Sequence, residues 1–156
     1  GQLAARFART RGAAVTVTDK SSTRLALSVA DQIVNTSAQT VDFALSQFDV
    51  LIDATGKMEA IAPMLMNVKK GGRVVMLGYY DSVALPYQPI FLRELVLVSS
   101  AQWAHGDLER ARDAIASGAV DVRPLLTHRM VAAQARLAFD VAFNDIECVK
   151  MLLKWD

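Results

Sequence analysis

The sequence predicts an α/β fold in which a doubly wound parallel sheet is built from alternating strands and helices. Apolar segments of strand length alternate with segments of helical pattern along most of the chain. The expected strands at 48–54 and 73–78 are almost continuously apolar, as strands covered on both faces are. The pair Gly71-Gly72 between them is typical of the end of a helix.

The first residues predict the second half of a dinucleotide-binding βαβ unit. A helix is expected over 2–11 and a strand over 14–19, and this strand ends on Asp19. In such a unit the first strand and the start of the glycine-rich turn precede the helix, so Gly1 would be the last glycine of G-x-G-x-x-G. We therefore expect a Rossmann-like sheet truncated at its N-terminus, in which the two neighbours of the first strand lack a partner.

The pattern of the remaining residues predicts further elements in order. Pro86 and Pro89 indicate a loop across 81–92. Gly118 indicates the end of a helix over 107–117. The other expected elements are helix 22–30, strand 32–35, helix 38–46, strand 48–54, helix 58–69, strand 73–78, strand 95–100, helix 107–117, strand 125–130, helix 132–143 and strand 148–155.

Composition limits the classes of function. The 156 residues are 53% hydrophobic and can bury a core, and the net charge of +1 gives no reason to expect nucleic acid or an anionic membrane as a partner. The single Cys148 excludes an internal disulfide and favours a reducing, cytoplasmic location. The apolar runs have strand length, so no transmembrane segment is expected.

Asp19 is the first candidate for cofactor binding. It lies eighteen positions after Gly1 (19 − 1), at the carboxyl end of a predicted strand. A carboxylate there accepts hydrogen bonds from the ribose of adenosine and repels a 2′-phosphate, which favours NAD over NADP. The alternative is that Asp19 caps the helix that begins near Ser22. Arg24, one turn into that helix, could reach the same ribose or remain a solvated charge.

Two later strand ends are candidates for the rest of the crevice. Residues 53–56 (DATG) follow one strand and 78–80 (GYY) follow the next. Ligands of doubly wound sheets bind at the carboxyl ends of the strands. The alternatives are a simple turn in which Gly56 supplies a positive φ, and surface aromatics at Tyr79 and Tyr80.

We expect no catalytic residue and no metal ligand within this chain. His105 and His128 are the only histidines, and neither has other ligands at metal-binding spacing on the same element. No G-x-S-x-G elbow is present, and Cys148 lies in an apolar segment where cysteines are usually inert. This absence fits the cofactor-binding part of an enzyme whose catalytic groups lie elsewhere.

The order of these motifs resembles the nucleotide-binding domain and C-terminus of the medium-chain dehydrogenase/reductase superfamily, the zinc-type alcohol dehydrogenases. The motifs are 1–5 (GQLAA), 17–19 (VTD) with Arg24, 50–56 (VLIDATG), 71–78 (GGRVVMLG) and 125–129 (LLTHR). The resemblance implies that residues 1–156 are a partial NAD-binding Rossmann-like domain with the C-terminal segment of a larger dehydrogenase, whose N-terminal catalytic domain is absent. The segment 27–31 is shorter than the family pattern, which puts the length of the second helix in question.

The C-terminal half is similar to the bacteriochlorophyllide dehydrogenases of this superfamily. The similar segments are 79–80 (YY), 91–94 (FLRE), 100–103 (SAQW), 142–145 (AFND) and 148–151 (CVKM), with Trp155. The similarity implies an NAD-dependent oxidation of the 3-(1-hydroxyethyl) group of bacteriochlorophyllide to 3-acetyl, in bacteriochlorophyll biosynthesis. Trp103 would then either help to wall a tetrapyrrole site or pack in the core.

The resemblance also implies roles for single residues. Gly1 matches the glycine at the pyrophosphate, and Asp19 and Arg24 match the ribose-binding acid and its basic neighbour. The adenosine side is matched by Ala54 and Thr55, the nicotinamide side by Leu77, Gly78, Tyr79, Ser100 and Ala101, and the pyrophosphate again by Lys150. The resemblance allows zinc in the preceding domain and is compatible with a homo-oligomer.

Three alternatives remain open for the parent protein. It could be a polyol dehydrogenase or a threonine dehydrogenase of the same superfamily, or a non-catalytic module that kept the nucleotide site. If the parent is an enzyme, we expect this chain alone to be inactive, because a catalytic domain would have to supply the proton relay.

Overall fold

The computed structural model describes residues 1–155, which form two compact units. We call residues 42–108, together with Gly1, the central unit, and residues 2–41 with those from 109 onward the terminal unit. All strand pairs within the described residues are parallel. The prediction of a Rossmann-like fold of helices and parallel strands is therefore confirmed.

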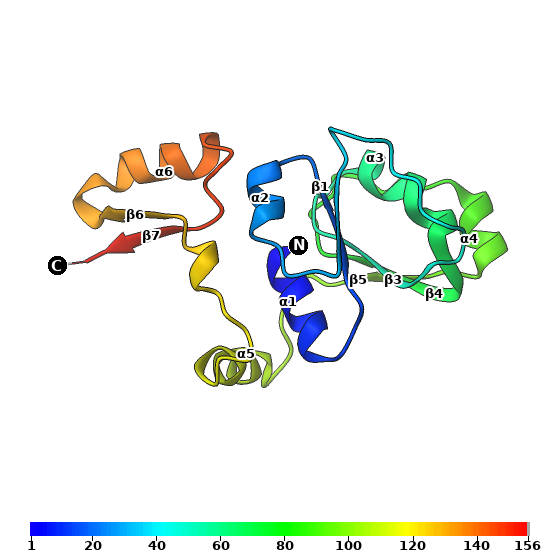
Figure 1. Cartoon of the computed structure of the whole chain (residues 1–156), viewed down its shortest axis with the longest axis horizontal. Helices are drawn as coiled ribbons and strands as arrows, with labels where there is room; N and C mark the ends of the chain where they lie inside the picture. The colour runs from blue at the N-terminus through cyan, green and yellow to red at the C-terminus, as the bar shows by residue number, and fades with distance from the viewer. Residues whose placement is uncertain (156) are drawn as a thin grey trace. The chain divides into compact units, whose positions relative to one another are not determined.

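The central unit is a three-stranded sheet with helices on one side (Figure 1). The strands β3 (Phe48–Asp53), β4 (Val68–Met76) and β5 (Val96–Ser99) lie in the order β3-β4-β5. The helices are α3 (Met58–Ile61), the 3-10 helix η1 (Ala62–Asn67) and α4 (Tyr87–Arg93). The core between them is fully apolar, and it is formed by Ile61, Leu65, Val68 and Val74.

The terminal unit contains two parallel strand pairs. In the first, β1 (Thr16–Asp19) pairs with β2 (Gln32–Asn35), with helices α1 (Gln2–Thr10) and α2 (Ser22–Ala26). In the second, β6 (His128–Val131) pairs with β7 (Met151–Lys154), and α6 (Ala135–Asn144) packs on this pair (Figure 1). The helix α5 (Asp107–Ala116) and the 3-10 helices η2 (Arg123–Leu125) and η3 (Ala132–Gln134) complete the elements.

Every strand in the described residues except β4 has a hydrogen-bonded neighbour on one side only. In its ladder β1 pairs with β2 alone, and in its own ladder β3 pairs with β4 alone. Each therefore has one free edge in the described residues.

Arg6 is a buried cation that joins three segments of the terminal unit. Its side chain donates from Nε to the carbonyl of Asp121 at 2.9 Å, from Nη2 to the carbonyl of Leu27 at 2.9 Å, and from Nη1 to Oε1 of Gln2 at 2.9 Å. Only 5% of the residue is exposed. Burial lowers the pKa of Arg6, and the nearby charge of Asp121 opposes this shift.

The predicted helix over 38–46 is wrong, because polar groups of a neighbouring segment bind its backbone. The side chain of Asn67 donates to the carbonyls of Phe43 and Ala44 at 2.7 and 3.2 Å. Ser46 has a left-handed φ of 56°, and its N–H donates to the carbonyl of Met66 at 3.2 Å. These bonds hold the segment in an irregular path.

The helix predicted over 22–30 ends early, as α2. Side chains of α1 bond carbonyls at and just after its end, in addition to the backbone N–H groups of Leu27 and Ser28. Gln2 donates to the carbonyl of Arg24 at 2.7 Å, and Arg6 donates to that of Leu27. The shortness of this segment in the sequence therefore reflects a shorter helix.

The helix predicted over 58–69 also ends earlier than expected, and β4 begins at Val68 instead of 73. The glycine pair lies inside this strand, where the register shifts between Phe48 and Val50 of β3. Gly71 has a φ of 72°, and a Cβ on Gly72 would lie 2.5 Å from Cγ1 of Val68. The glycines thus permit a bulge in a strand and do not mark a helix end.

The predicted loop over 81–92 contains α4. Pro86 is the N-cap of this helix and Pro89 lies in its first turn, where no intrahelical N–H bond is required. Both prolines are therefore compatible with a helix start, which the sequence analysis interpreted as a loop.

The C-terminal elements exist but are shorter than predicted. The strand expected over 125–130 begins at His128, because Pro124 opens the 3-10 helix η2. The helix expected over 132–143 starts as η3, and the strand expected over 148–155 is reduced to β7. Cys148 is buried, as predicted, but in a turn in which its N–H donates to the carbonyl of Asp145 at 3.0 Å.

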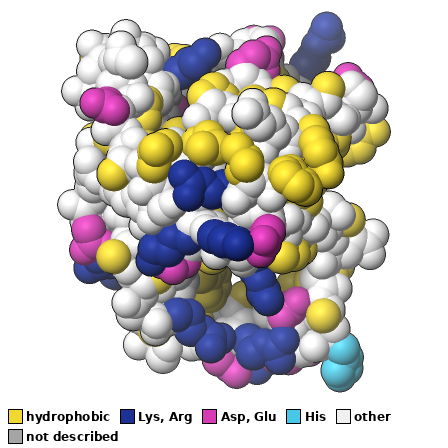
Figure 2. Space-filling view, turned by 90° about the vertical axis from the view of Figure 1, so that its right-hand side faces the viewer, with side chains coloured by type: hydrophobic (Ala, Val, Ile, Leu, Met, Phe, Trp, Pro, Cys, Tyr) yellow, Lys and Arg dark blue, Asp and Glu magenta, His cyan; other side chains and the backbone are white. Residues whose placement is uncertain are grey.

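Large apolar side chains are exposed on both units. Phe91 and Tyr87 of α4 are 64% and 72% exposed, and Phe139 and Phe143 of α6 are 59% and 81% exposed. Figure 2 shows hydrophobic side chains at the surface beside charged ones. Exposed apolar surface of this kind is typical of regions that contact other polypeptide or a ligand. No helix within residues 1–155 is long and apolar enough to cross a membrane.

We predict that Arg6→Met destabilises the protein by about 3 kcal/mol, because the carbonyls of Leu27 and Asp121 and the amide oxygen of Gln2 all lose the donor that Arg6 supplies. Urea denaturation followed by circular dichroism measures the loss. Arg11→Met is the matched control, since Arg11 is exposed and directly follows the end of the same helix. Equal stabilities of the two variants would contradict the assigned role of Arg6.

Candidate functional site

The central unit brings the carboxyl ends of its three strands to one edge. Asp53 of β3 aligns with Met76 of β4, and Met76 aligns with Ser99 of β5. The N–H of Leu77 donates to the carbonyl of Asp53 at 2.8 Å, and that of Ser100 donates to the carbonyl of Met76 at 3.3 Å. Seven of the predicted site residues follow these ends, namely Ala54, Thr55, Leu77, Gly78, Tyr79, Ser100 and Ala101.

The side chain of Asp53 organises this edge. One of its oxygens accepts from the hydroxyl of Thr55 at 2.7 Å, and the other accepts from the N–H groups of Thr55 and Gly56 at 3.2 and 3.0 Å. The hydroxyl of Tyr80 donates to that second oxygen as well. Asp53 is only 6% exposed. Burial raises the pKa of this carboxyl, but these hydrogen bonds outweigh it and hold the pKa below its usual value.

The aromatic residues at this edge differ in exposure. Tyr79 is 89% exposed and Trp103 is 67% exposed, so the interpretation of Trp103 as a core residue is wrong. Tyr80 turns toward Asp53, and burial together with that carboxylate raises its pKa. Tyr79 and Trp103 are therefore available to contact a ligand, whereas the hydroxyl of Tyr80 is already bonded.

In the terminal unit, Asp19 lies at the end of β1 beside the start of α2. Its Oδ1 accepts from the N–H of Ser21 at 2.9 Å, and the hydroxyl of Ser21 accepts from the N–H of Arg24 at 3.2 Å. The N-cap of α2 is therefore Ser21, and the alternative role of Asp19 as this cap is wrong. Within residues 1–155, Oδ2 of Asp19 and the guanidinium of Arg24 make no hydrogen bond, so both can bind a ligand.

The remaining predicted residues are Lys150 and Gly1. Lys150 precedes β7 in the terminal unit, where its carbonyl accepts from the N–H of His128 at 3.2 Å. Its exposed side chain forms no ion pair in the described part of the chain. Gly1 precedes α1 and has open space around the position of a Cβ.

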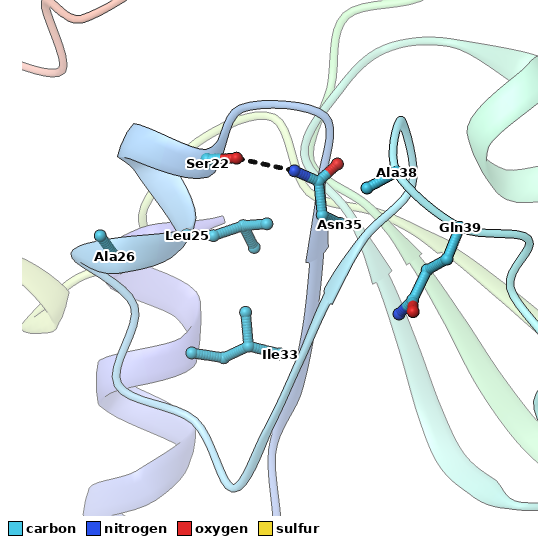
Figure 3. A pocket seen from close by; sticks show the side chains of 7 residues that line it. All are labelled: Ser22, Leu25, Ala26, Ile33, Asn35, Ala38 and Gln39. Atoms are coloured by element: carbon cyan, nitrogen blue, oxygen red, sulfur yellow. Dashed lines mark hydrogen bonds between the residues drawn. The ribbon is translucent and has the colours of Figure 1, made fainter.

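An open groove of about 420 Å³ lies between α2 and β2 (Figure 3). Leu25 and Ile33 form its apolar part, and the amide of Asn35 donates to the hydroxyl of Ser22 at 2.8 Å across its upper end. The groove exists because α2 is too short to cover β2, which leaves Ile33 46% exposed. None of the predicted site residues lines it.

The described residues contain no group of three or more His, Cys, Asp or Glu side chains that could hold a metal ion. His128 lies 3.4 Å from Asp145, from Nε2 to Oδ2, and its Nδ1 is 3.0 Å from the hydroxyl of Thr127. Asp53 and Tyr80 lie in the two candidate segments 53–56 and 78–80, but the sequence analysis assigned neither side chain a binding role. The signal available was the position of Asp53 at a strand end inside DATG, but no sequence pattern pairs it with Tyr80.

The chain is similar to known dehydrogenases. It is 37% identical over 109 residues to the 2-desacetyl-2-hydroxyethyl bacteriochlorophyllide A dehydrogenase of Rhodobacter capsulatus, a match that covers 69% of this chain and 35% of the relative. It is 28% identical over 167 aligned positions to the L-threonine 3-dehydrogenase of Cronobacter sakazakii, covering 100% of this chain and 49% of the relative. The chain thus spans half or less of the length of these relatives.

A solved structure agrees with this similarity. A protein of Sinorhizobium meliloti 1021 assigned as a zinc-binding dehydrogenase, solved bound to NADP, superposes with a TM-score of 0.86 at 27% identity. The match covers 97% of this chain and 48% of the other. The family described as zinc-binding dehydrogenase matches residues 1–117. From this match and the Rossmann-like fold, the chain belongs to the zinc-binding dehydrogenase family of the medium-chain dehydrogenase/reductase superfamily.

Proposed function

We propose that this chain is the cofactor-binding part of an NAD-dependent alcohol dehydrogenase that oxidises a secondary alcohol to a ketone. The observation that carries this proposal is the carboxylate of Asp19 at the end of β1, one oxygen of which is fixed by Ser21 while the other is free within the described residues. A free carboxylate oxygen accepts a ribose hydroxyl. The guanidinium of Arg24, which makes no hydrogen bond within the described residues, belongs to the short helix α2 that follows β1.

Within the terminal unit, the free carboxylate oxygen of Asp19 fits a ribose hydroxyl of NAD. Asp19 and Arg24 would hold the adenosine ribose, and Ala54 and Thr55 would contact the adenosine side. The nicotinamide side would lie along Leu77, Gly78, Tyr79, Ser100 and Ala101, and Gly1 and Lys150 would contact the pyrophosphate. When bound, NAD accepts the hydride that leaves the alcohol.

The described residues do not fit zinc, since no ligand cluster occurs among them. A metal that polarises the alcohol would belong to another part of the parent protein, as the name of the matched family implies. The role of this chain is then to orient the cofactor against an alcohol held elsewhere.

We further propose bacteriochlorophyllide as the substrate, oxidised at its 3-(1-hydroxyethyl) group to 3-acetyl. The name of the Rhodobacter relative at 37% identity supports this proposal. So does the exposure of Tyr79 and Trp103, which follow the ends of β4 and β5 and can present flat surfaces to a tetrapyrrole. The alternatives are a polyol or a threonine dehydrogenase, and a module that binds a nucleotide without hydride chemistry.

The first prediction concerns the cofactor. In the full-length parent, Asp19→Ala should weaken NAD binding by about 1–3 kcal/mol, because a charged hydrogen-bond acceptor is lost. Fluorescence titration with NADH and NADPH measures both affinities. Asp42→Ala, which removes an exposed carboxylate, is the control and should bind NADH like the wild type. Tighter binding of NADPH than of NADH by the wild type would overturn the proposal.

The second prediction concerns the chain by itself. Residues 1–156 should oxidise no secondary alcohol and should contain no stoichiometric zinc, because no metal-ligand cluster occurs in the described part. Metal analysis of the purified chain and an assay of NADH formation test this. Turnover after contaminating dehydrogenases are removed would place catalytic groups in this chain.

The third prediction concerns the substrate. The full-length enzyme should have a higher kcat/KM for 3-hydroxyethyl bacteriochlorophyllide than for sorbitol or threonine. Tyr79→Ala or Trp103→Ala should raise the KM of the macrocycle more than that of a small alcohol, since a small alcohol does not reach a flat wall. A higher kcat/KM for sorbitol or threonine would leave the proposed dehydrogenase function in place but contradict the proposed tetrapyrrole substrate.

A further inference from the structure

The carboxylate of Asp53 connects two turns that are distant in sequence. Three of its hydrogen bonds come from its own turn, from the N–H and hydroxyl of Thr55 and the N–H of Gly56. The fourth comes from the hydroxyl of Tyr80, 27 residues further along, after the end of β4. The same carboxylate therefore determines the shape of the first turn and the position of the second.

The backbones of these two turns are also in direct contact. A Cβ on Gly78 would lie 2.3 Å from the backbone nitrogen of Gly56 and 2.5 Å from its Cα. A Cβ on Gly56 would lie 2.5 Å from the carbonyl oxygen of Tyr79. Neither glycine could carry a side chain without moving the other turn, so the two turns adopt one joint arrangement.

Neighbouring tyrosines have opposite roles in this arrangement. Tyr79 is 89% exposed, while Tyr80 places its hydroxyl on the buried carboxylate of Asp53. Anchoring Tyr80 fixes the backbone of the preceding residues, and with it the direction in which the Tyr79 ring leaves the protein. Leu77 is held from the other side by its bond to the carbonyl of Asp53.

We propose that Asp53 and Tyr80 are a positioning pair that holds the backbone of Leu77 to Tyr79 in place for the nicotinamide half of the cofactor. This inference rests on the proposed function. The adenosine half would be held by Asp19 and Arg24, so loss of the pair should disturb the placement of the reacting ring more than cofactor binding. Small displacements of a reacting group slow a reaction strongly.

The directions of the two pKa shifts indicate that Asp53 stays ionised and Tyr80 stays protonated across neutral pH, so the hydrogen bond between them persists there. The hydrogen bonds lower the pKa of Asp53, so the carboxylate stabilises the fold above its unfolded pKa, and this stabilisation is lost as the pH falls through the lowered value. Burial and Asp53 raise the pKa of Tyr80. Its contribution is complete below the unfolded pKa and is lost only as the pH rises through the raised value.

Kinetics of the full-length enzyme test the pair. Tyr80→Phe should lower kcat by about 10- to 100-fold and change the Kd for NADH less than about threefold. With the best of the three alcohols above, deuterated at its carbinol carbon, the isotope effect on kcat should increase, because hydride transfer becomes slower. A purely structural loss lowers the amount of active enzyme and leaves the isotope effect unchanged. Tyr87→Phe, in α4 and 72% exposed, is the matched control and should behave like the wild type.

Alkaline titration of phenolate absorbance tests the same contact without turnover. Subtracting the titration curve of Tyr80→Phe from that of the wild type leaves the absorbance change of Tyr80 alone. The pH at the midpoint of this difference should lie above the value for an unperturbed tyrosine, about 10. Asp53→Asn should lower this midpoint, because the negative charge that keeps the phenol protonated is removed. A Tyr80 midpoint that does not respond to Asp53→Asn would overturn the contact.

The outcomes separate this inference from the proposed function. A wild type that binds neither NADH nor NADPH overturns the cofactor function. A wild type that uses NAD, with kcat and isotope effect unchanged in Tyr80→Phe, overturns only the positioning pair. If Tyr80→Phe does not fold, the test is made with Asp53→Asn, which must show the loss of kcat and the raised isotope effect. A wild-type kcat and isotope effect in Asp53→Asn also overturn the positioning pair.

Discussion

The arrangement of the sheet edge in the central unit depends on one buried charge. Removing a carboxylate from water costs several kcal/mol unless hydrogen bonds replace its hydration. The carboxylate of Asp53 is 6% exposed and receives four such bonds, three from its own turn and one from Tyr80. The local bonds alone would define an ordinary turn. The bond from Tyr80 makes the geometry of that turn depend on the residues that follow β4, which is why two strand ends share one structure.

The terminal unit contains a buried charge of the opposite sign, stabilised in another way. Arg6 is 5% exposed, and its guanidinium meets carbonyl oxygens of Leu27 and Asp121 and the amide oxygen of Gln2. These acceptors are dipoles, and the charge of Asp121 adds to them, whereas burial lowers the pKa of Arg6. A guanidinium remains charged under such conditions because its unperturbed pKa is so high. Each unit is therefore organised by an ion that bonds mainly to polar groups of the backbone and of uncharged side chains.

The parallel strands and their order along the chain could be predicted, since they follow from apolar runs that local pattern reveals. The errors arose where a distant group binds the backbone. Nothing within 38–46 indicates that Asn67 takes two carbonyls of that segment, and nothing within 22–30 indicates that Gln2 and Arg6 bond the end of α2. The glycine pair before 73 and the prolines of α4 are compatible with more than one structure. For the site, DATG indicated the strand end, but the pairing of Asp53 with Tyr80 depends on strand register.

Cofactor choice illustrates how much a few side chains decide on a shared fold. The Sinorhizobium protein with NADP has a TM-score of 0.86 to this chain, so the fold alone does not select between the two cofactors. Two opposite charges act at the end of β1. Unit charges about 4 Å apart near a protein surface interact by about 4 kcal/mol, so Asp19 and a 2′-phosphate would repel strongly, while Arg24 would attract it. The position of Asp19 is fixed by the N–H of Ser21. The guanidinium of Arg24, at the end of a flexible side chain, can move toward either cofactor or away from it. The repulsion cannot relax in this way, and this difference between the two side chains is the physical basis of the proposed preference for NAD.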